Sequence, residues 1–284
     1  MLEEGGTLEY KTLLFEIREH VGWLTLNRPD KGNALSLEMV QELRQFFADL
    51  EKDLDIRIVV IRGAGKHFCT GLDLLSSFGA GQSEINPAAG LAPTRFDPRG
   101  CRIQWDFNDI IAKMRQAPQP IVASTRGVAL GGGFGIALAC DIRLASQAAR
   151  FNVGATRIGF SGGEMGMSYF LPRLIGLSKA AEFMYTARWI DAAAAERIGL
   201  ISRAVPDDQL DQATEDLVQE MLAVSPFALR MTKEVLYANV DAPSLEQAAK
   251  LENRTQLMCG FTQDAMEAIK AVYMDKRRPA YEDK

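Results

Sequence analysis

The sequence predicts an α/β fold that continues into an all-helical C-terminal region. Short β-branched runs, such as IRIVVIRG at 56–63, alternate with stretches of helical periodicity, and glycines or prolines end most of them. The pattern changes after Pro206, where four consecutive segments have helical spacing. We therefore place a domain boundary there, with residues 1–206 as the α/β core and residues 207–284 as a helical domain.

The individual elements follow from local patterns. Strands are predicted from β-branched content, apolar–polar alternation and closing glycines, and helices from apolar residues three or four apart next to capping residues. The predicted strands cover residues 12–18, 21–27, 56–63, 121–129, 142–146, 149–153 and 200–205. The predicted helices cover residues 37–50, 103–117, 178–187, 192–198, 207–223, 225–238, 244–259 and 262–276, with one more after the glycine run described below.

Two regions have unusual composition. Residues 79–102 are rich in Gly, Ala, Pro, Ser and Asn and have weak periodicity, which predicts a mobile or variable loop that could act as a lid. The helical tail has more apolar residues than isolated surface helices need, so we expect it to pack on the core or on another subunit. These apolar residues are Leu217, Met221, Leu222, Leu236 and Leu251.

Composition excludes several classes of function. The formal net charge of −5 argues against a nucleic-acid partner, and no apolar run approaches the roughly 20 residues of a membrane span. Residues 1–11 lack the basic and apolar regions of a secretory signal, and the four cysteines are scattered without a CxxC pair. These features predict a cytoplasmic protein with reduced thiols.

Histidine is scarce, which limits the possible mechanisms. The chain has two histidines, and His20 lies in a charged segment that predicts a turn. A Ser-His-Asp or Cys-His mechanism would therefore depend on His67, next to Phe68, which we expect to be structural or to line a wall. A histidine-rich zinc site is also not expected, and we predict no metal.

The most informative stretch is GVALGGGFGIALACDIRLAS at 127–146. Three consecutive glycines inside apolar sequence are costly to order, because glycine loses more backbone freedom than any other residue. They make sense where a ligand approaches the main chain or where a helix N-terminus faces a developing oxyanion. Tight packing of a strand on a helix, with no ligand, explains the same pattern.

Further motifs accompany this glycine run in a specific order. They are NRPDKGNAL at 27–35, GKHFCTGLDL at 65–74, RWIDAAAAERIGLISRAVP at 188–206 and, near the C-terminus, MDKRRPAY from Met274. Together with the glycine run, they resemble the signatures of the crotonase family, which includes enoyl-CoA hydratases and isomerases. The resemblance covers residues 12–206 and extends to the helical end.

The resemblance implies a spiral of repeated β-β-α units and a C-terminal helical domain that forms trimers, often paired into hexamers. Family members bind an acyl-CoA thioester, so coenzyme A is expected as part of the substrate, with no separate cofactor. The partners expected are this substrate and further copies of the chain, as a homotrimer or a dimer of trimers. Neither nucleic acid nor a membrane is expected.

The resemblance also implies an oxyanion hole. By position, its donors are the backbone N–H groups of Leu72 and of Gly132, the middle glycine. Removing a proton beside a thioester places negative charge on the carbonyl oxygen, where each preorganised donor contributes about 2.7–4 kcal/mol. Residues implied to bind substrate or CoA are Arg28, Lys31, Ala34, Gly71, Asp73, Leu74 and Gly131.

The chain departs from the family at the acid–base groups. Family hydratases add water with two glutamates, and the matching positions here are Gly135 and Ala155. Because both carboxylates are missing, two-glutamate hydration is not expected.

One acid, Glu164, lies nearby in SGGEMG. It resembles the carboxylate of some family isomerases, seven residues before the pair Leu171-Pro172, and a single base can remove a proton and return it elsewhere. Alternatively, Ser161 and Glu164 form a capping box at a helix start, which would keep Glu164 ionised.

Two functional hypotheses follow. In the first, an enoyl-CoA binds to the two backbone donors and Glu164 shifts its double bond, while hydration, hydrolysis or C–C cleavage remain possible on the same scaffold. In the second, the protein is a catalytically silent acyl-CoA binder or scaffold that has lost its acids. RNA binding, known among family relatives, is disfavoured by the negative net charge.

Overall fold

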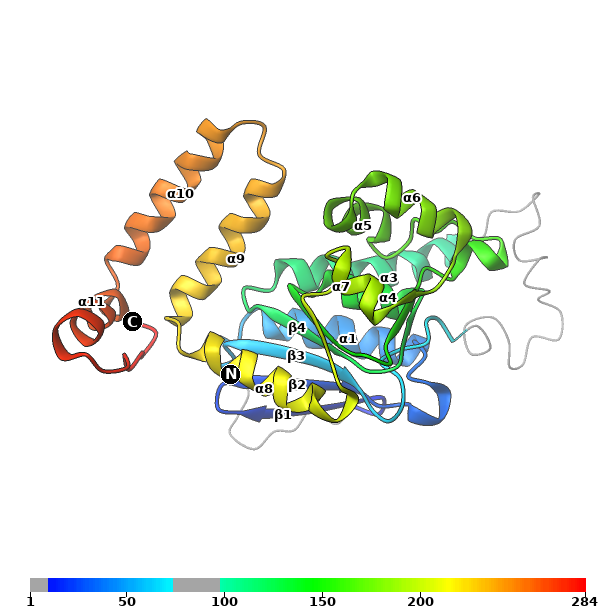
Figure 1. The fold of residues 1–284 in the computed structure, drawn as a ribbon, viewed down its shortest axis with the longest axis horizontal. Helices are drawn as coiled ribbons and strands as arrows, with labels where there is room; N and C mark the ends of the chain where they lie inside the picture. Colours follow the sequence, from blue (N-terminus) through cyan, green and yellow to red (C-terminus); the bar gives the residue numbers. More distant parts are fainter. Residues whose placement is uncertain (1–9, 74–97) are drawn as a thin grey trace.

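A computed structural model describes residues 10–73 and 98–284 of the chain (Figure 1). It has the predicted α/β fold, with a six-stranded sheet in the order β1-β2-β3-β4-β6-β9. The first pair is antiparallel and the other strands are parallel. The strands of this sheet are β1 (Leu13–Arg18), β2 (Val21–Leu26), β3 (Ile58–Gly63), β4 (Ile121–Thr125), β6 (Ile142–Ser146) and β9 (Arg203–Val205).

A smaller sheet lies beside the first. It contains β5 (Val128–Leu130), β7 (Arg150–Asn152) and β8 (Ile190–Asp191). The prediction of one strand over 121–129 is therefore wrong, because the chain changes sheets after Thr125. Gly127 makes the change: its φ is +61°, and a β-carbon there would lie 2.2 Å from the carbonyl oxygen of Lys66. The close approach of two backbone segments requires glycine at this position.

Two helices of the core begin at a residue whose side chain caps them. Ser36 accepts a hydrogen bond from the Met39 amide at 3.2 Å, and Asp191 accepts one from the Ala194 amide at 2.7 Å. The helices are α1 (Leu37–Leu50), α3 (Pro98–Gln116), α4 (Gly132–Ala139), α5 (Met167–Ile175), α6 (Leu177–Thr186) and α7 (Ala192–Arg197).

Two differences from the predicted helices matter for the site. Helix α3 begins at Pro98, before the predicted start at residue 103, so the end of the predicted loop 79–102 is helical and the rest falls outside the described residues. Helix α5 was not predicted. Its N-cap is Gly166, with no side-chain cap, so the usual signal for a helix start is missing.

Apolar packing covers both faces of the large sheet. The main core contains the inner faces of α1, α3 and α4. A second cluster joins strand residues Trp23, Val60 and Val122 to Val218 of helix α8 (Leu210–Leu222). Since α8 follows Pro206 in the chain yet packs on the sheet, the first helix of the predicted tail belongs to the core by its contacts. The domain boundary itself remains a prediction.

The remaining helices extend away from the sheet (Figure 1). They are α9 (Pro226–Val240), α10 (Leu245–Gly260), α11 (Gln263–Ile269) and the π-helical turn η4 (Lys270–Asp275). Helix α10 returns alongside α9, and α11 lies beyond its end. The predicted caps Ser225, Ser244 and Thr262 each accept a hydrogen bond from the amide three residues later.

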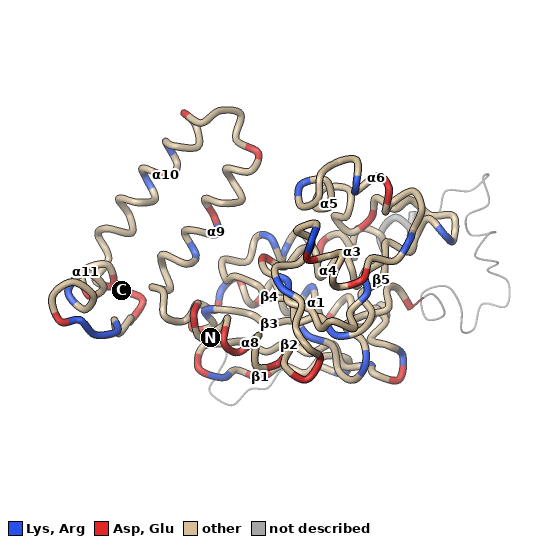
Figure 2. The backbone as a smooth tube through the Cα atoms, in the orientation of Figure 1, with Lys and Arg blue, Asp and Glu red and all other residues tan. Residues whose placement is uncertain are grey.

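Charges are dispersed over the chain. Figure 2 shows Lys and Arg interspersed with Asp and Glu along the described backbone rather than gathered in one basic stripe. Among the described residues, no helix is long and apolar enough to cross a membrane.

Candidate active site

The first donor of the predicted oxyanion hole lies where β5 meets α4. Gly131, with φ +51°, is the N-cap of α4, and its own amide donates to the Asn152 carbonyl at 3.0 Å. Gly132 is the first residue of the helix. In residues 10–73 and 98–284, its N–H has no acceptor, as expected for the first turn of a helix. This N–H therefore offers a preorganised donor with partial positive charge.

The second donor lies on a neighbouring segment. Residues 71–73 run parallel to Leu35, whose amide donates to the Gly71 carbonyl at 2.7 Å and whose carbonyl accepts from the Asp73 amide at 3.0 Å. Since successive amides of an extended segment point to opposite sides, the Leu72 N–H points away from Leu35. The described part of the chain provides no acceptor for it.

Gly71 and Gly131 bring the two donor segments together. A β-carbon on Gly71, whose φ is +94°, would lie 3.0 Å from the Leu130 carbonyl oxygen and 3.8 Å from the Gly131 α-carbon. Any side chain at either glycine would enter the space between the segments. Leu72 directly follows Gly71, and Gly132 directly follows Gly131. The structure thus places these two residues on backbone segments that adjoin each other.

Glu164 faces the same place. Its Oε1 lies 3.9 Å from the position that a β-carbon on Gly131 would occupy. The side chain is half-buried, and burial raises the pKa of its carboxyl above the ordinary value of 4.5. No described residue donates a side-chain or backbone hydrogen bond to this carboxylate. Among the described residues, this half-buried carboxylate has no hydrogen-bond donor, and the two N–H groups beside it have no acceptor. Such a carboxylate can exchange protons with a bound molecule.

The capping-box alternative for Glu164 is wrong. Helix α5 begins at Met167 rather than near Ser161, and the Ser161 hydroxyl accepts instead from the Gly163 amide at 3.1 Å. The expectation that a helix N-terminus holds Glu164 ionised is also wrong, because burial is the cause that shifts its pKa and it favours the neutral acid.

The two positions that lack hydratase glutamates differ in their surroundings. At Gly135, a β-carbon would lie 2.7 Å from Cβ of Met165, so this methionine fills the space. Ala155 is buried at the start of the short 3-10 turn η2 (Ala155–Ile158). From the sequence, Met165 is interpreted only as pocket wall or plain core, because no local pattern indicates that it packs over Gly135.

Of the predicted CoA-binding residues, Arg28 has a structural role as well. Its guanidinium donates to the Ala34 carbonyl at 2.6 Å and to Asp73 Oδ2 at 2.8 Å, so it joins the two segments that were predicted to bind substrate. Lys31 is exposed at the end of the 3-10 turn η1 (Pro29–Lys31), and Leu74 lies outside the described residues. The structure therefore brings Arg28, Ala34 and Asp73 together.

Asn33 is a positioning residue that sequence reasoning missed. Its side chain donates to the carbonyls of Ala64 and His67, at 2.9 and 2.7 Å, and accepts from the Arg28 amide. Its φ of +56°, next to Gly32, is compatible with the enrichment of asparagine in left-handed turns. The pattern GN in the first motif could have indicated this turn.

His67 has a structural contact, as predicted. Its Nδ1 accepts from the Val128 amide at 3.3 Å, which links the Leu72 segment to β5. Within the described ranges, no group of three or more His, Cys, Asp or Glu side chains could hold a metal ion.

Comparison with known proteins decides the family. A family model described as "Enoyl-CoA hydratase/isomerase" matches residues 16–284. The chain belongs to this family. Enoyl-CoA hydratase/isomerase enzymes act on acyl-CoA thioesters, and the crotonase resemblance noted in the sequence is thereby confirmed.

Some relatives of this chain are named enoyl-CoA hydratase, and one is named enoyl-CoA isomerase. A "Probable enoyl-CoA hydratase EchA12" of Mycobacterium tuberculosis is 35% identical over 94% of this chain and 90% of its own length. A crystal structure of an enoyl-CoA hydratase from Bacillus anthracis is 28% identical, with a TM-score of 0.86, covering 96% of this chain and 100% of the other. A monofunctional enoyl-CoA isomerase from M. smegmatis is 34% identical, with a TM-score of 0.68, covering 84% and 98%.

Proposed function

We propose that this enzyme shifts the double bond of an enoyl-CoA. The thioester oxygen accepts hydrogen bonds from the N–H groups of Leu72 and Gly132, and Glu164 carries the proton. The base removes a proton from C2 of a 3-enoyl thioester, the charge moves onto the oxygen, and the same acid returns the proton to C4. Atoms and charge balance with a single carboxyl group, which is regenerated at the end.

One observation carries the proposal: the Glu164 carboxylate faces Gly131, next to the proposed donor Gly132. Met165 fills the space that a side chain at Gly135 would need. A proton shuttle needs one acid beside the oxyanion hole. Burial also suits the role of a base, because a raised carboxyl pKa makes the ionised group a stronger base.

Hydration of a 2-enoyl-CoA is the second candidate, because EchA12 and the Bacillus anthracis relative carry hydratase names. Hydration requires one group to activate water and a proton to reach the neighbouring carbon. Among the described residues at this site, Glu164 alone would have to do both. We therefore rank it below isomerisation.

Steady-state assays on 3-enoyl-CoA and 2-enoyl-CoA with Glu164→Gln test the proposal. We expect isomerase kcat to fall about 10²–10⁴-fold, as when a positioned acid–base group is removed. Glu182→Gln, which removes a surface carboxylate paired with Lys179 on α6, is the matched control and should retain activity. Unchanged isomerisation in Glu164→Gln would reject the role of Glu164. Rapid hydration with no isomerisation would favour the second candidate, and tight acyl-CoA binding with no turnover would indicate a silent binder.

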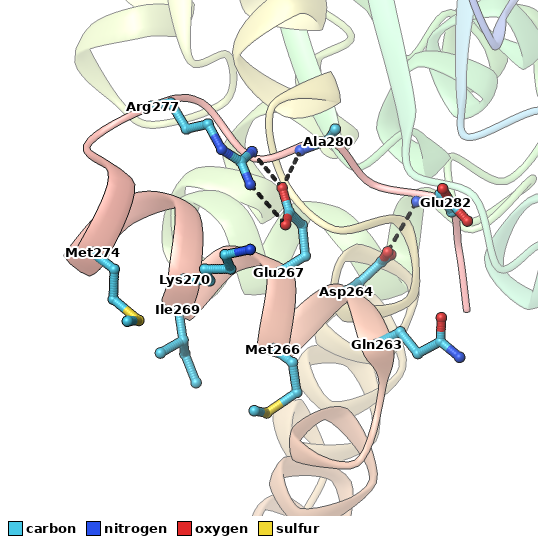
Figure 3. Close-up of a pocket in the computed structure, with 10 residues that line it drawn as sticks. All are labelled: Gln263, Asp264, Met266, Glu267, Ile269, Lys270, Met274, Arg277, Ala280 and Glu282. Carbon is cyan, nitrogen blue, oxygen red and sulfur yellow. Dashed lines mark hydrogen bonds and ion pairs between the residues drawn. The ribbon is translucent and has the colours of Figure 1, made fainter.

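We also propose that the chain assembles into the homotrimer that the family resemblance implies. Large apolar side chains are exposed on the last helices, including Phe261 at 88% and Tyr273 at 79%. Beside them, a cavity of about 680 Å³ is lined by Met266, Ile269 and Met274 together with charged side chains that include Glu267, Lys270 and Arg277 (Figure 3). Exposed apolar area of this kind marks a protein–protein contact surface.

Sedimentation equilibrium checks the assembly. Phe261→Asp should shift the mass toward the monomer, since a charge would be buried against a second copy. Tyr185→Asp, at an 83% exposed aromatic on α6, is the control and should leave the mass unchanged. A monomeric wild-type chain would contradict the proposal.

A further inference from the structure

A second cavity, of about 450 Å³, lies between helices α3, α5 and α9. Ile111, Phe170, Tyr169 and Tyr237 give it mostly apolar and aromatic walls, and Arg115 contributes a cation. Pockets of this size, with a few polar groups on apolar walls, are typical of small-molecule sites. Its lining includes neither donor of the oxyanion hole nor Glu164, so it has no role in the proton transfer proposed above.

The charge of Arg115 is only weakly compensated. Among the described residues, the only acid that pairs with it is Asp141, at 3.7 Å. That carboxylate is already used: it accepts from the Ile121 amide at 2.6 Å and from the Tyr237 hydroxyl, and Lys233 Nζ lies 3.1 Å away. Because the Lys233 side chain is only 6% exposed, Lys233 rather than Arg115 is the principal counter-charge of Asp141.

The surrounding cluster carries a surplus of positive charge. Arg143, also buried, donates to three backbone carbonyl oxygens at 2.6–3.4 Å and contacts no carboxylate among the described residues. Arg115, Lys233 and Arg143 thus face one acid, Asp141. Since charges act more strongly where water is excluded, this surplus favours an anion in the adjoining cavity, and Arg115 is the cation that lines it.

The guanidinium of Arg115 is held for such a contact. Its central carbon lies 3.0 Å from the ring centroid of Tyr237 and 5.3 Å from that of Phe170. Stacking on aromatic faces fixes the plane of the guanidinium and leaves its edge for hydrogen bonds to a carboxylate. We propose that this cavity binds a carboxylate carried on an apolar or aromatic stem, with Arg115 as its partner.

The cavity lies close to the candidate active site along the chain. Gly166, which lines it, is two residues after Glu164, so their α-carbons are at most about 7 Å apart. An acyl group that ends in a carboxylate is therefore one source of the ligand, and this source rests on the proposed function. A free carboxylic acid with the same chemistry is the other source, and it does not depend on that function.

Turnover of matched substrates tests the acyl source. We compare kcat/KM for mono-CoA thioesters of unsaturated diacids with that for neutral enoyl-CoA esters of equal length, over a series of lengths. At the favoured length, Arg115→Gln should lower the diacid-to-neutral ratio about tenfold to a hundredfold, the range for a hydrogen bond to a charged group. Arg115→Lys should restore part of the ratio, and Lys113→Gln, on the same helix but outside the cavity, should leave it unchanged.

Binding of benzoate, with benzamide as the neutral match, tests the free acid by calorimetry. Saturable binding of benzoate but not benzamide, lost in Arg115→Gln, supports the site even if the diacid ratio is flat. Thermal unfolding shows whether the variants fold. Ala112→Phe keeps Arg115 but narrows the cavity from its exposed wall, so this variant should also lose the discrimination between benzoate and benzamide. It serves as the test if Arg115→Gln does not fold.

The outcomes separate the two proposals. A flat diacid ratio together with no benzoate binding overturns the carboxylate site. A chain that turns over no enoyl-CoA of any kind overturns the proposed function instead, and the benzoate measurement then decides the carboxylate site alone.

Discussion

Met165 packs directly over Gly135: a β-carbon on Gly135 would lie 2.7 Å from Cβ of Met165 and 2.9 Å from its carbonyl oxygen. The sulfur of the same methionine lies 2.8 Å from the β-carbon position of Gly132. Met165 is thus wedged against two glycines of α4, and its chain neighbour is Glu164. The space that a hydratase glutamate would need at position 135 instead holds the residue that positions the remaining acid.

Gly135→Ala should therefore destabilise the fold. Alanine favours a helix over glycine by roughly 0.5–1 kcal/mol, but overpacking against Met165 costs about 1–3 kcal/mol, and one clashing atom is backbone. We expect net destabilisation of about 1–2 kcal/mol and a lower isomerase kcat, measured by denaturant unfolding and steady-state assays. Gly260→Ala on α10 is the control, because a β-carbon there meets nothing within 4 Å. Equal effects of the two substitutions would contradict this account of Met165.

The activity should depend on the ionisation of Glu164. The base must be ionised to remove a proton, so kcat/KM for isomerisation should fall as the pH drops through a pKa above 4.5. The stability effect has the opposite sign. A raised pKa in the folded state disfavours ionisation there, so its stabilising contribution is complete below pH 4.5 and is lost as the pH rises through the raised pKa.

Glu164→Gln should then be at least as stable as the wild type at neutral pH, and this advantage should vanish below pH 4.5. Denaturant unfolding at several pH values measures it. A variant that is less stable at every pH would show that the carboxylate has a structural partner after all.

Asp141 should be important for stability rather than for chemistry. It joins β4 and α9 by accepting from Ile121 and Tyr237 next to the buried Lys233. Asp141→Asn leaves buried cations without their counter-charge, which typically costs about 3–5 kcal/mol. Burial lowers the pKa of Lys233, so this lysine can lose its proton and reduce the cost at high pH.

Urea unfolding of Asp141→Asn measures this loss. Asp241→Asn is the control: it removes an exposed acid that pairs with Arg173, and we expect little change. If both substitutions have the same small effect, the buried cluster does not anchor α9.

The C-terminal segment should loosen in acid. Arg277 forms two hydrogen bonds to Glu267 and lowers the pKa of that carboxyl to about 2, and the Ala280 amide donates to the same group (Figure 3). Because the folded-state pKa is lowered, the contribution is present above pH 4.5 and is lost as the pH falls toward 2.

Hydrogen exchange of the Ala280 amide should therefore accelerate between pH 4.5 and 2, beyond the intrinsic change with pH. Glu267→Gln should show fast exchange already at neutral pH, whereas Glu246→Gln, which breaks an exposed pair with Lys250, should not. Slow exchange in Glu267→Gln would mean that other contacts hold the segment.

Elements with local signals were predictable. Ser36, Asp191 and Ser244 cap helices through their own side chains, so the residue types near each helix start were sufficient to predict where the helix begins. Helix α5 was missed because Gly166 precedes it, and a glycine provides no side-chain cap. The split of 121–129 into β4 and β5 was missed because only the contact of Gly127 with Lys66 requires the turn.

For the site, the order of motifs was enough to choose Leu72, Gly132 and Glu164, whereas their environment was not predictable. The capping-box alternative placed a helix start at Ser161, but α5 begins at Met167, so Glu164 lies before the helix with its side chain half-buried. Its pKa consequently shifts upward, against the expectation.

The amino-acid sequence by itself determined the α/β class, the helical tail, the family and the identity of the candidate donors, because these depend on local periodicity, caps and ordered motifs. Only the tertiary structure decided that Gly71 and Gly131 adjoin, that Met165 fills the space at Gly135 and that Arg115 lines a cavity beside a surplus of buried charge. The physical reason is that packing, desolvation and charge balance arise between residues far apart in the chain, and no local pattern records them.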